Sequence, residues 1–242
     1  VNGLKFFKLI LGKGFKAFTK RFEVKKLKEQ ITATLAALAE NNMQPYYCAT
    51  KAEALAQVKA LLKPGQSIGL GGSESLKQTG VLELVARPEY RLQNRYAPGL
   101  TRAQALDVMR QSFLADVFIC SANAITQQGE LYNVDGNGNR VSAMIFGPKS
   151  VIVVAGVNKI VPDLSAAVQR VKAIAAPQNA KRLGCQTPCA KTGQCLALQQ
   201  GKTGLCSGCS APQRICSSYT VLGWQQQKGR IKVILCGEEL GY

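Results

Sequence analysis

The chain has 242 residues, of which 46% are hydrophobic, and 31 Lys and Arg against 14 Asp and Glu give it a formal net charge of +17. This composition suits one large or two small globular domains, and no apolar run approaches the roughly 18 residues of a membrane span. The chain contains no histidine, which excludes imidazole as a general acid, a general base or a metal ligand.

The positive charge is concentrated in two regions. Residues 1–28 contain nine Lys or Arg and one acidic residue, and residues 164–237 contain ten Lys or Arg and no Asp or Glu. Such regions attract small anions, membrane surfaces or nucleic acid. No aromatic-rich RNA motif or nucleic-acid-binding helix accompanies them, so nucleic acid is the least expected of these partners.

Residues 1–23 form the first predicted unit, a basic amphipathic extension. Phe and Leu recur at helical spacing against lysines, and Gly12 and Gly14 interrupt the pattern. Such a helix either contacts a membrane surface or packs on the domain or a partner, and both interpretations stay open. The chain shows no secretory signal, so we expect a cytoplasmic protein, with peripheral membrane contact through this extension as the alternative.

Residues 24–176 alternate predicted helices and strands. Helices are expected over residues 24–41, 51–62, 101–114 and 163–174, and strands over residues 45–48, 67–70, 90–95, 117–120 and 151–155. The alternation predicts an α/β fold, a mostly parallel sheet with helices on both faces. Residues 177–242 are expected to complete the same domain with a loop-rich cysteine segment and a last strand over residues 231–236.

A glycine turn follows the strand that begins at Ser67. Gly71 and Gly72 leave room for a phosphate or carboxylate, and Ser73 is a good N-cap for the following helix. A plain capped turn has the same sequence, but open α/β sheets bind ligands at such turns. All three residues are therefore candidate ligand-binding residues.

The segment over residues 121–140 is more polar than a connection between two buried strands requires. Its glycines let backbone amides approach a ligand, and a helix that begins near residue 139 would favour an anion. A hairpin is the alternative interpretation. Asp135 is the carboxylate best placed to act as a catalytic base. The candidate ligand-binding residues here are Asn123, Thr126, Asn133, Gly136, Asn139 and Arg140.

Six of the nine cysteines lie within residues 185–216, in a segment rich in Gly and Ser. Clustered thiols in a chain without a secretory signal are more often metal ligands than disulfides. Zinc or an iron–sulfur cluster requires about four sulfurs, and a Cys-x2-Cys pair such as Cys206 and Cys209 is the usual nucleus. Reduced structural cysteines in a covering loop are the alternative.

Three runs resemble the lactate-utilisation (LUD domain) family: Ser121-Ala-Asn-Ala-Ile-Thr, Gly129-Glu-Leu-Tyr-Asn and Asp135-Gly-Asn-Gly-Asn-Arg-Val. The likeness runs from about Val24 to Tyr242. It implies the broader fold of glucosamine-phosphate deaminase, ribose-phosphate isomerase and CoA transferases, with the pocket at the glycine turn.

The resemblance extends to a family tail of the form Thr-Pro-Cys, Lys-Thr-Gly-x-Cys, Cys, then Arg-Ile-Cys. The Lys-Thr-Gly-x-Cys block occurs twice here, ending at Cys195 and at Cys206, and only Cys206 keeps the two-residue gap to Cys209. The resemblance therefore implies that Cys195 is dispensable and that the metal ligands are Cys189, Cys206, Cys209 and Cys216.

Three classes of function stay open. The resemblance implies a component or relative of an iron–sulfur-dependent L-lactate oxidation system, with a small anionic ligand and redox partner subunits. The second class is an enzyme acting on a sugar phosphate or CoA ester, although Asn123 stands where some isomerases have Asp, and Glu130 is expected at a strand start. The third is a non-catalytic, metal-bearing binding module.

Overall fold

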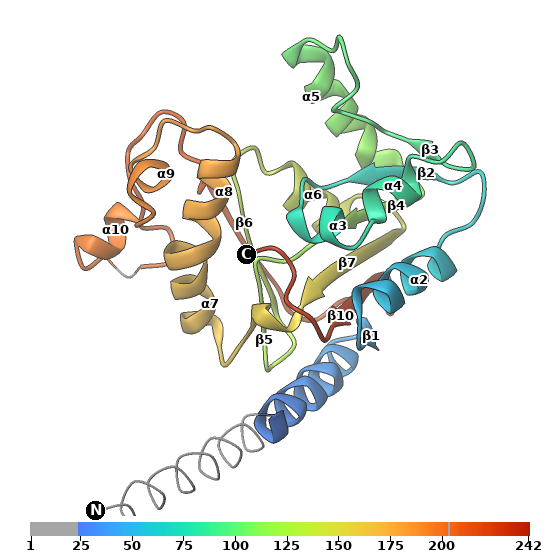
Figure 1. The fold of residues 1–242 in the computed structure, drawn as a ribbon, viewed down its shortest axis with the longest axis horizontal. Helices are drawn as coiled ribbons and strands as arrows, with labels where there is room; N and C mark the ends of the chain where they lie inside the picture. Colours follow the sequence, from blue (N-terminus) through green and yellow to red (C-terminus); the bar gives the residue numbers. More distant parts are fainter. Residues whose placement is uncertain (1–23, 203) are drawn as a thin grey trace, which may run out of the picture.

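The computed structural model describes residues 24–202 and 204–242, and its centre is a parallel β-sheet (Figure 1). The sheet has six strands in the order β1-β10-β7-β4-β2-β3, and every pair of neighbours is parallel. The strands are β1 (Gln44–Cys48), β2 (Ser67–Leu70), β3 (Arg91–Leu92), β4 (Val117–Cys120), β7 (Ser150–Gly156) and β10 (Ile231–Cys236). The predicted α/β fold with a mostly parallel sheet is confirmed.

The two apolar runs at the centre of the sequence form the centre of this sheet. All residues of β4 are buried, as are all residues of β7 after Ser150. Val117 and Ile119 join the apolar core on one face, whereas Phe118 and Cys120 join the core on the other. Because successive side chains of a strand point to opposite faces, strands covered on both sides lack polar alternation.

Helices cover both faces of the sheet. One core is completed by α2 (Lys51–Leu61), α3 (Glu74–Gln78) and α4 (Val81–Val85). The helix over residues 24–40 and α6 (Asn139–Phe146) complete the other. Ser73 caps α3 and Thr101 caps α5 (Arg102–Gln111), each by accepting a backbone hydrogen bond as predicted.

Two predicted elements are shorter than expected. The strand predicted over residues 90–95 is only the two-residue β3, because the Asn94 side chain accepts a hydrogen bond from the Tyr96 amide at 3.0 Å and bends the chain. The helix predicted over residues 101–114 ends at Gln111 and is followed by a 3₁₀ turn, Ser112–Leu114.

A second sheet of four strands lies in the order β8-β5-β6-β9 and was not predicted. Its strands are β5 (Ala124–Thr126), β6 (Leu131–Asp135), β8 (Ile160–Val161) and β9 (Ser218–Leu222). The antiparallel pair β5 and β6 shows that part of the polar segment is a hairpin. Its turn has Gly129 at φ +78°, where a Cβ atom would lie 2.5 Å from the Ala37 carbonyl carbon, so only glycine suits this position.

The helix predicted to end at residue 174 continues to Arg182, and Pro177 therefore does not mark the start of a loop region. The segment comprises α7 (Leu164–Arg170), a π-helical turn (Val171–Ala175) and α8 (Ala176–Arg182). Pro177 is the second residue of α8, which directly follows the π-helical turn, so the irregular hydrogen bonding of the helix coincides with the proline.

The cysteine segment is less loop-rich than predicted. It contains α9 (Pro188–Thr192), which packs against α8, and α10 (Leu196–Gln199), and Figure 1 shows both helices far from α2. The predicted N-terminal extension, with its expected membrane contact, lies outside the described residues. Within residues 24–202 and 204–242, no helix has the length and apolar character to cross a membrane.

Candidate functional site

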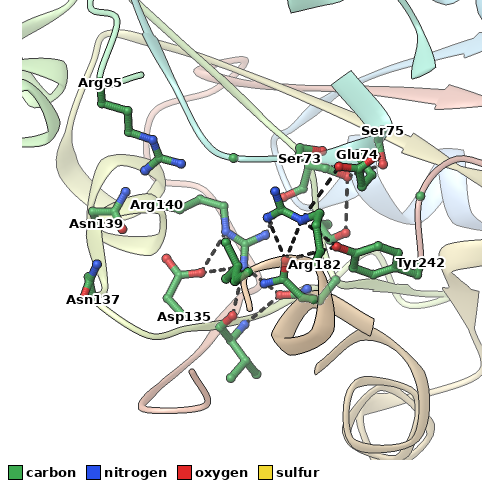
Figure 2. A pocket seen from close by; sticks show the side chains of 18 of the residues that line it. Ser73, Glu74, Ser75, Arg95, Asp135, Asn137, Asn139, Arg140, Arg182 and Tyr242 are labelled. Atoms are coloured by element: carbon green, nitrogen blue, oxygen red, sulfur yellow. Dashed lines mark hydrogen bonds and ion pairs between the residues drawn. The ribbon is translucent and has the colours of Figure 1, made fainter. Parts of the chain in front are cut away.

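A cleft of about 390 Å³ lies at the carboxyl edge of the parallel sheet (Figure 2). Its lining comes from segments that follow β2, β3, β4, β7 and β10, from the end of β6, and from α3, α5, α6 and α8. This is the edge where open α/β sheets bind ligands, because the strand-to-helix turns converge there. The polar side chains that line it are Ser73, Glu74, Ser75, Arg95, Tyr96, Ser121, Asn123, Asp135, Asn137, Asn139, Arg140, Lys159, Asn179, Arg182 and Tyr242.

The structure brings part of the predicted ligand site to this cleft. The predicted residues among its lining are Gly72, Ser73, Asn123, Asp135, Asn139 and Arg140. Gly71, Thr126, Asn133 and Gly136 are not among the lining residues. Gly71 packs behind the cleft, where a Cβ atom would lie 2.9 Å from the Cβ atom of Cys120.

The other predicted residues outside the cleft have local structural partners. Thr126 donates a hydrogen bond to a Glu130 carboxylate oxygen at 2.8 Å and accepts one from the Glu130 amide, which closes the β5–β6 hairpin. Asn133 is fully buried, and its side-chain oxygen accepts a hydrogen bond from the Asn123 amide at 3.2 Å. Gly136 lies against Ile215, whose Cα atom would be 3.4 Å from an added Cβ atom.

Arg140 and Asp135 form a buried ion pair in the wall of the cleft (Figure 2). The Arg140 Nε and Nη2 atoms both donate to Asp135 Oδ1, at 2.9 and 2.6 Å, and the Val141 amide donates to Oδ2 at 3.0 Å. Arg140 also donates to the Ser121 carbonyl oxygen and to Asn123 Oδ1. These contacts connect β4, β6 and α6, so both charges are committed to partners within the protein.

Arg95 has a different environment. The half-buried side chain stacks on Tyr96, with 4.8 Å from its guanidinium carbon to the ring centroid, and Nη2 donates to the Tyr96 hydroxyl at 2.6 Å. Its buried Nε has no hydrogen-bond acceptor, and among the described residues no carboxylate lies within 4.0 Å of the guanidinium. A Cβ atom on Gly72 would lie 2.6 Å from Nη2 of Arg95, so glycine lets Arg95 approach this turn.

Arg182 reaches the cleft from the end of α8. Its Nε atom donates to the Tyr242 hydroxyl at 2.8 Å, Nη2 donates to Asn179 Oδ1 at 2.8 Å, and Glu74 Oε1 lies 3.8 Å from Nε. Figure 2 shows Arg182 and Tyr242 on the side of the cleft away from Arg95. Arg182 and Tyr242 were not predicted, because no motif indicated that these two residues lie beside the glycine turn.

Lys159, in the turn that follows β7, is buried and lines the cleft. Its Nζ atom donates to Ser75 Oγ and Ser121 Oγ at 2.9 Å each and to the Ala122 carbonyl oxygen at 3.1 Å. Burial first, and then the charges of Arg170 and Arg140, lower the pKa of Lys159 to about 7. Its only sequence signal is its position directly after an apolar strand.

The LUD domain family profile matches residues 31–236, which include every residue of the cleft lining except Gly241 and Tyr242. The chain belongs to the LUD domain family. The family is linked to lactate utilisation. No curated protein matches the chain.

Two solved structures are similar to this LUD domain. One is a DUF162 family protein from Deinococcus radiodurans, with 15% identity over 87% of this chain and 98% of that chain and a TM-score of 0.44. The other is a D-ribose-5-phosphate isomerase in complex with phospho-erythronic acid, with 18% identity over 48% of this chain and 55% of that chain and a TM-score of 0.31.

The cysteine segment of this LUD domain protein encloses a second, small cavity of about 30 Å³. Cys189, Cys195, Cys209 and Cys216 line it, whereas the exposed Cys206 does not. The predicted set contained Cys206 in place of Cys195. In residues 24–202 and 204–242, no three Cys, Asp or Glu side chains are positioned to hold one metal ion.

Arg214 organises the backbone around this cavity. It donates to the carbonyl oxygens of Cys206, Cys209 and Cys216, at 3.1, 3.1 and 2.6 Å, and to the Tyr219 hydroxyl at 2.7 Å. Burial and the neighbouring thiols raise the pKa of Cys216 to about 11, while Arg214 lowers it. The arginine therefore brings positive charge to a group of thiols.

Proposed function

We propose that this protein binds a small carboxylate or phosphate anion in the cleft, as a component or relative of an iron–sulfur-dependent L-lactate oxidation system. The lactate assignment rests on membership of the LUD domain family. The anionic character of the ligand rests on the charged residues of the cleft.

The proposal rests mainly on the missing hydrogen-bond acceptor of the Arg95 guanidinium. A half-buried guanidinium with an unpartnered Nε–H has already lost part of its hydration without gaining a carboxylate. An anion in the cleft would supply the missing acceptor, and guanidinium groups bind carboxylates and phosphates through two parallel hydrogen bonds. Stacking on Tyr96 holds the planar group in one orientation.

The other charges of the cleft favour the same class of ligand. Asp135 neutralises Arg140, and Glu74 is the acidic neighbour of Arg182. Within the part of the chain that the structure describes, Arg95 and any protonated fraction of Lys159 are then left without an acidic counterpart, so these residues give the cleft an excess of positive charge. A positive, partly enclosed cleft concentrates small anions.

The experiment compares Arg95→Gln with Arg110→Gln in calorimetric titrations with L-lactate, pyruvate and inorganic phosphate. Arg110 is an exposed arginine of α5 that pairs with Asp107 at 2.6 Å and does not line the cleft. We expect the unmodified protein and Arg110→Gln to bind alike, and Arg95→Gln to bind at least about tenfold more weakly. Equal affinity of Arg95→Gln and the unmodified protein would remove Arg95 from the site, and no binding by any of the three anions would refute the proposed function.

We also propose that the cysteine segment holds an iron–sulfur cluster or zinc, with Cys189, Cys195, Cys209 and Cys216 as ligands. Four thiols around one cavity, with Arg214 beside them, suit the donor set of either group. A cluster would give the protein a route for electrons to redox partner subunits. Zinc would require the sulfurs to move closer together, because no three of these groups converge on a single ion.

The choice between Cys195 and Cys206 is tested with the variants Cys195→Ser and Cys206→Ser. We expect Cys195→Ser to lower the iron or zinc content of anaerobically purified protein and to increase proteolysis of the segment, because metal binding is coupled to folding. Cys206→Ser is the matched control and should keep both properties. Loss of metal only in Cys206→Ser would restore the set implied by the family resemblance, and no metal in any variant would leave the thiols as structural residues.

A further inference from the structure

We infer that the hydroxyl groups of Ser75 and Ser121, backed by Lys159, bind the anionic group of the ligand, and that Lys159 takes up a proton when the anion binds. This inference rests on the proposed anion-binding function of the cleft. It assigns a binding role to three residues of the cleft that are not among the predicted site residues.

The hydrogen bonds around Lys159 leave the serine hydroxyl hydrogens available to a ligand. A protonated Nζ donates one hydrogen bond each to Ser75 Oγ, Ser121 Oγ and the Ala122 carbonyl oxygen. Both serine oxygens then act as acceptors, so each hydroxyl hydrogen must point elsewhere. The acceptors that the protein offers to these hydrogens form only long hydrogen bonds. Ser75 Oγ lies 3.3 Å from the Leu240 carbonyl oxygen, and Ser121 Oγ lies 3.3 Å from Ser75 Oγ and 3.4 Å from the Ala122 carbonyl oxygen. Because Ser75, Ser121 and Lys159 all line the cleft, a ligand oxygen there offers a better acceptor.

Among residues 24–202 and 204–242, no carboxylate forms an ion pair with Lys159. From α7, Arg170 faces it, and from α6 Arg140 faces it, both with positive charge. Cys120 on β4 is buried, with its pKa raised to about 12, so this thiol stays neutral at physiological pH. The nearby carboxylate Asp135 is bound to Arg140, and that of Glu74 lies beside Arg182.

An anion at the serine pair would supply the missing negative charge. Without ligand, burial and the two arginines hold the pKa of Lys159 at about 7, so the amine is only partly protonated near neutral pH. A bound anion favours the ammonium form and therefore raises this pKa. Above pH 7, binding must then take up a proton, and the affinity must fall as the pH rises.

The test is a calorimetric titration with pyruvate, and with L-lactate, between pH 6 and 8. The charge of these carboxylates does not change in this range. We expect the affinity to fall roughly tenfold from pH 6 to pH 8, because a pKa near 7 changes the protonated fraction by about that factor. Titrations at pH 8 in two buffers of different ionisation enthalpy should show uptake of close to one proton.

Three variants test whether the pH dependence of anion binding comes from Lys159 itself and not from any buried lysine. Lys159→Met should bind weakly and without pH dependence, whereas Lys172→Met should behave like the unmodified protein. Lys172 is a suitable control because it is equally buried, with 4% exposure against 4% for Lys159, but donates to Gly204 in the cysteine segment. Ser121→Ala keeps the lysine and should weaken binding at every pH.

A titration of the Lys159 Cε signal by nuclear magnetic resonance gives a readout that does not depend on how well a variant folds. The signal should titrate near pH 7 and shift its midpoint upward when pyruvate or L-lactate is added. Binding without proton uptake, or a midpoint that the ligand leaves unchanged, would overturn this inference and leave the proposed function in place. Failure of both anions and of phosphate to bind would overturn both.

Discussion

At the scale of single residues, Arg140 and Arg95 lie at the same cleft but differ in their neighbours. Arg140 is one of the predicted ligand-binding residues, because it lies at the start of a predicted helix in a polar segment. The structure gives Arg140 a buried carboxylate, two side-chain or backbone oxygens at 2.7 and 2.8 Å, and a position that connects three elements. We therefore expect Arg140 to position the cleft and Arg95 to contact the ligand.

The Arg140→Ala variant tests the positioning role. It leaves the Asp135 carboxylate, which is 9% exposed, without its counter-charge, and breaking such a buried pair costs about 3–5 kcal/mol of unfolding free energy. Urea denaturation measures the loss. Arg110→Ala removes an exposed pair and should cost less than about 1 kcal/mol. Similar small losses in both variants would contradict the positioning role.

Single-residue patterns could not identify Arg95, Arg182 or Lys159 in advance. None is among the predicted site residues, and their function depends on what lies opposite them in space. One signal was available for Arg95 and Lys159. Arg95 is the last residue of the strand predicted over residues 90–95, and Lys159 follows the strand predicted over residues 151–155, so the carboxyl edge of a parallel sheet would bring both to one place.

At the scale of elements, the sequence predicts the long and strongly patterned strands and helices well. β4, β7 and β10 are apolar runs bounded by turn residues, and α2 and α5 begin at capping residues. The second sheet could not be predicted from these patterns, because β5 and β8 have only three and two residues and their pairing depends on the rest of the fold. The extension of α7 into α8 was also missed, because a proline such as Pro177 usually ends a helix.

The β5–β6 hairpin depends on one glycine. Gly129→Ala would adopt φ +78° and place its Cβ atom 2.5 Å from the backbone of the helix over residues 24–40. We expect a loss of about 2–4 kcal/mol in unfolding free energy, because backbone strain and a backbone clash add. Gly65→Ala is the matched control, with φ +81° and nothing within 4 Å of the added Cβ atom. The Gly65→Ala variant should lose only the free energy of the strained backbone, about 1–2 kcal/mol. Equal losses of unfolding free energy in the two variants would show that the clash at Gly129 is relieved without cost.

At the scale of the whole molecule, the cleft is assembled by the topology of the sheet. Segments after β2, β3, β4, β7 and β10 contribute to it, although they are separated by as many as 170 residues in the chain. β10 lies between β1 and β7 in the sheet, which brings the C-terminal residues Gly241 and Tyr242 to the cleft. The sequence predicted a ligand site at this edge of the sheet, but the side chains that complete the cleft follow from strand order.

Of the two arginines, Arg95 and not Arg140 is proposed to contact the anion in this cleft. The most direct measurement follows the Nε–H signals of both arginines by nuclear magnetic resonance while pyruvate, L-lactate or phosphate is added, with Arg95→Gln to assign the Arg95 signal. We predict a saturable shift of the Arg95 signal, because its Nε–H gains an acceptor, and little change at Arg140, whose Nε–H already donates to Asp135. A saturable shift at Arg140 with none at Arg95 would contradict this account.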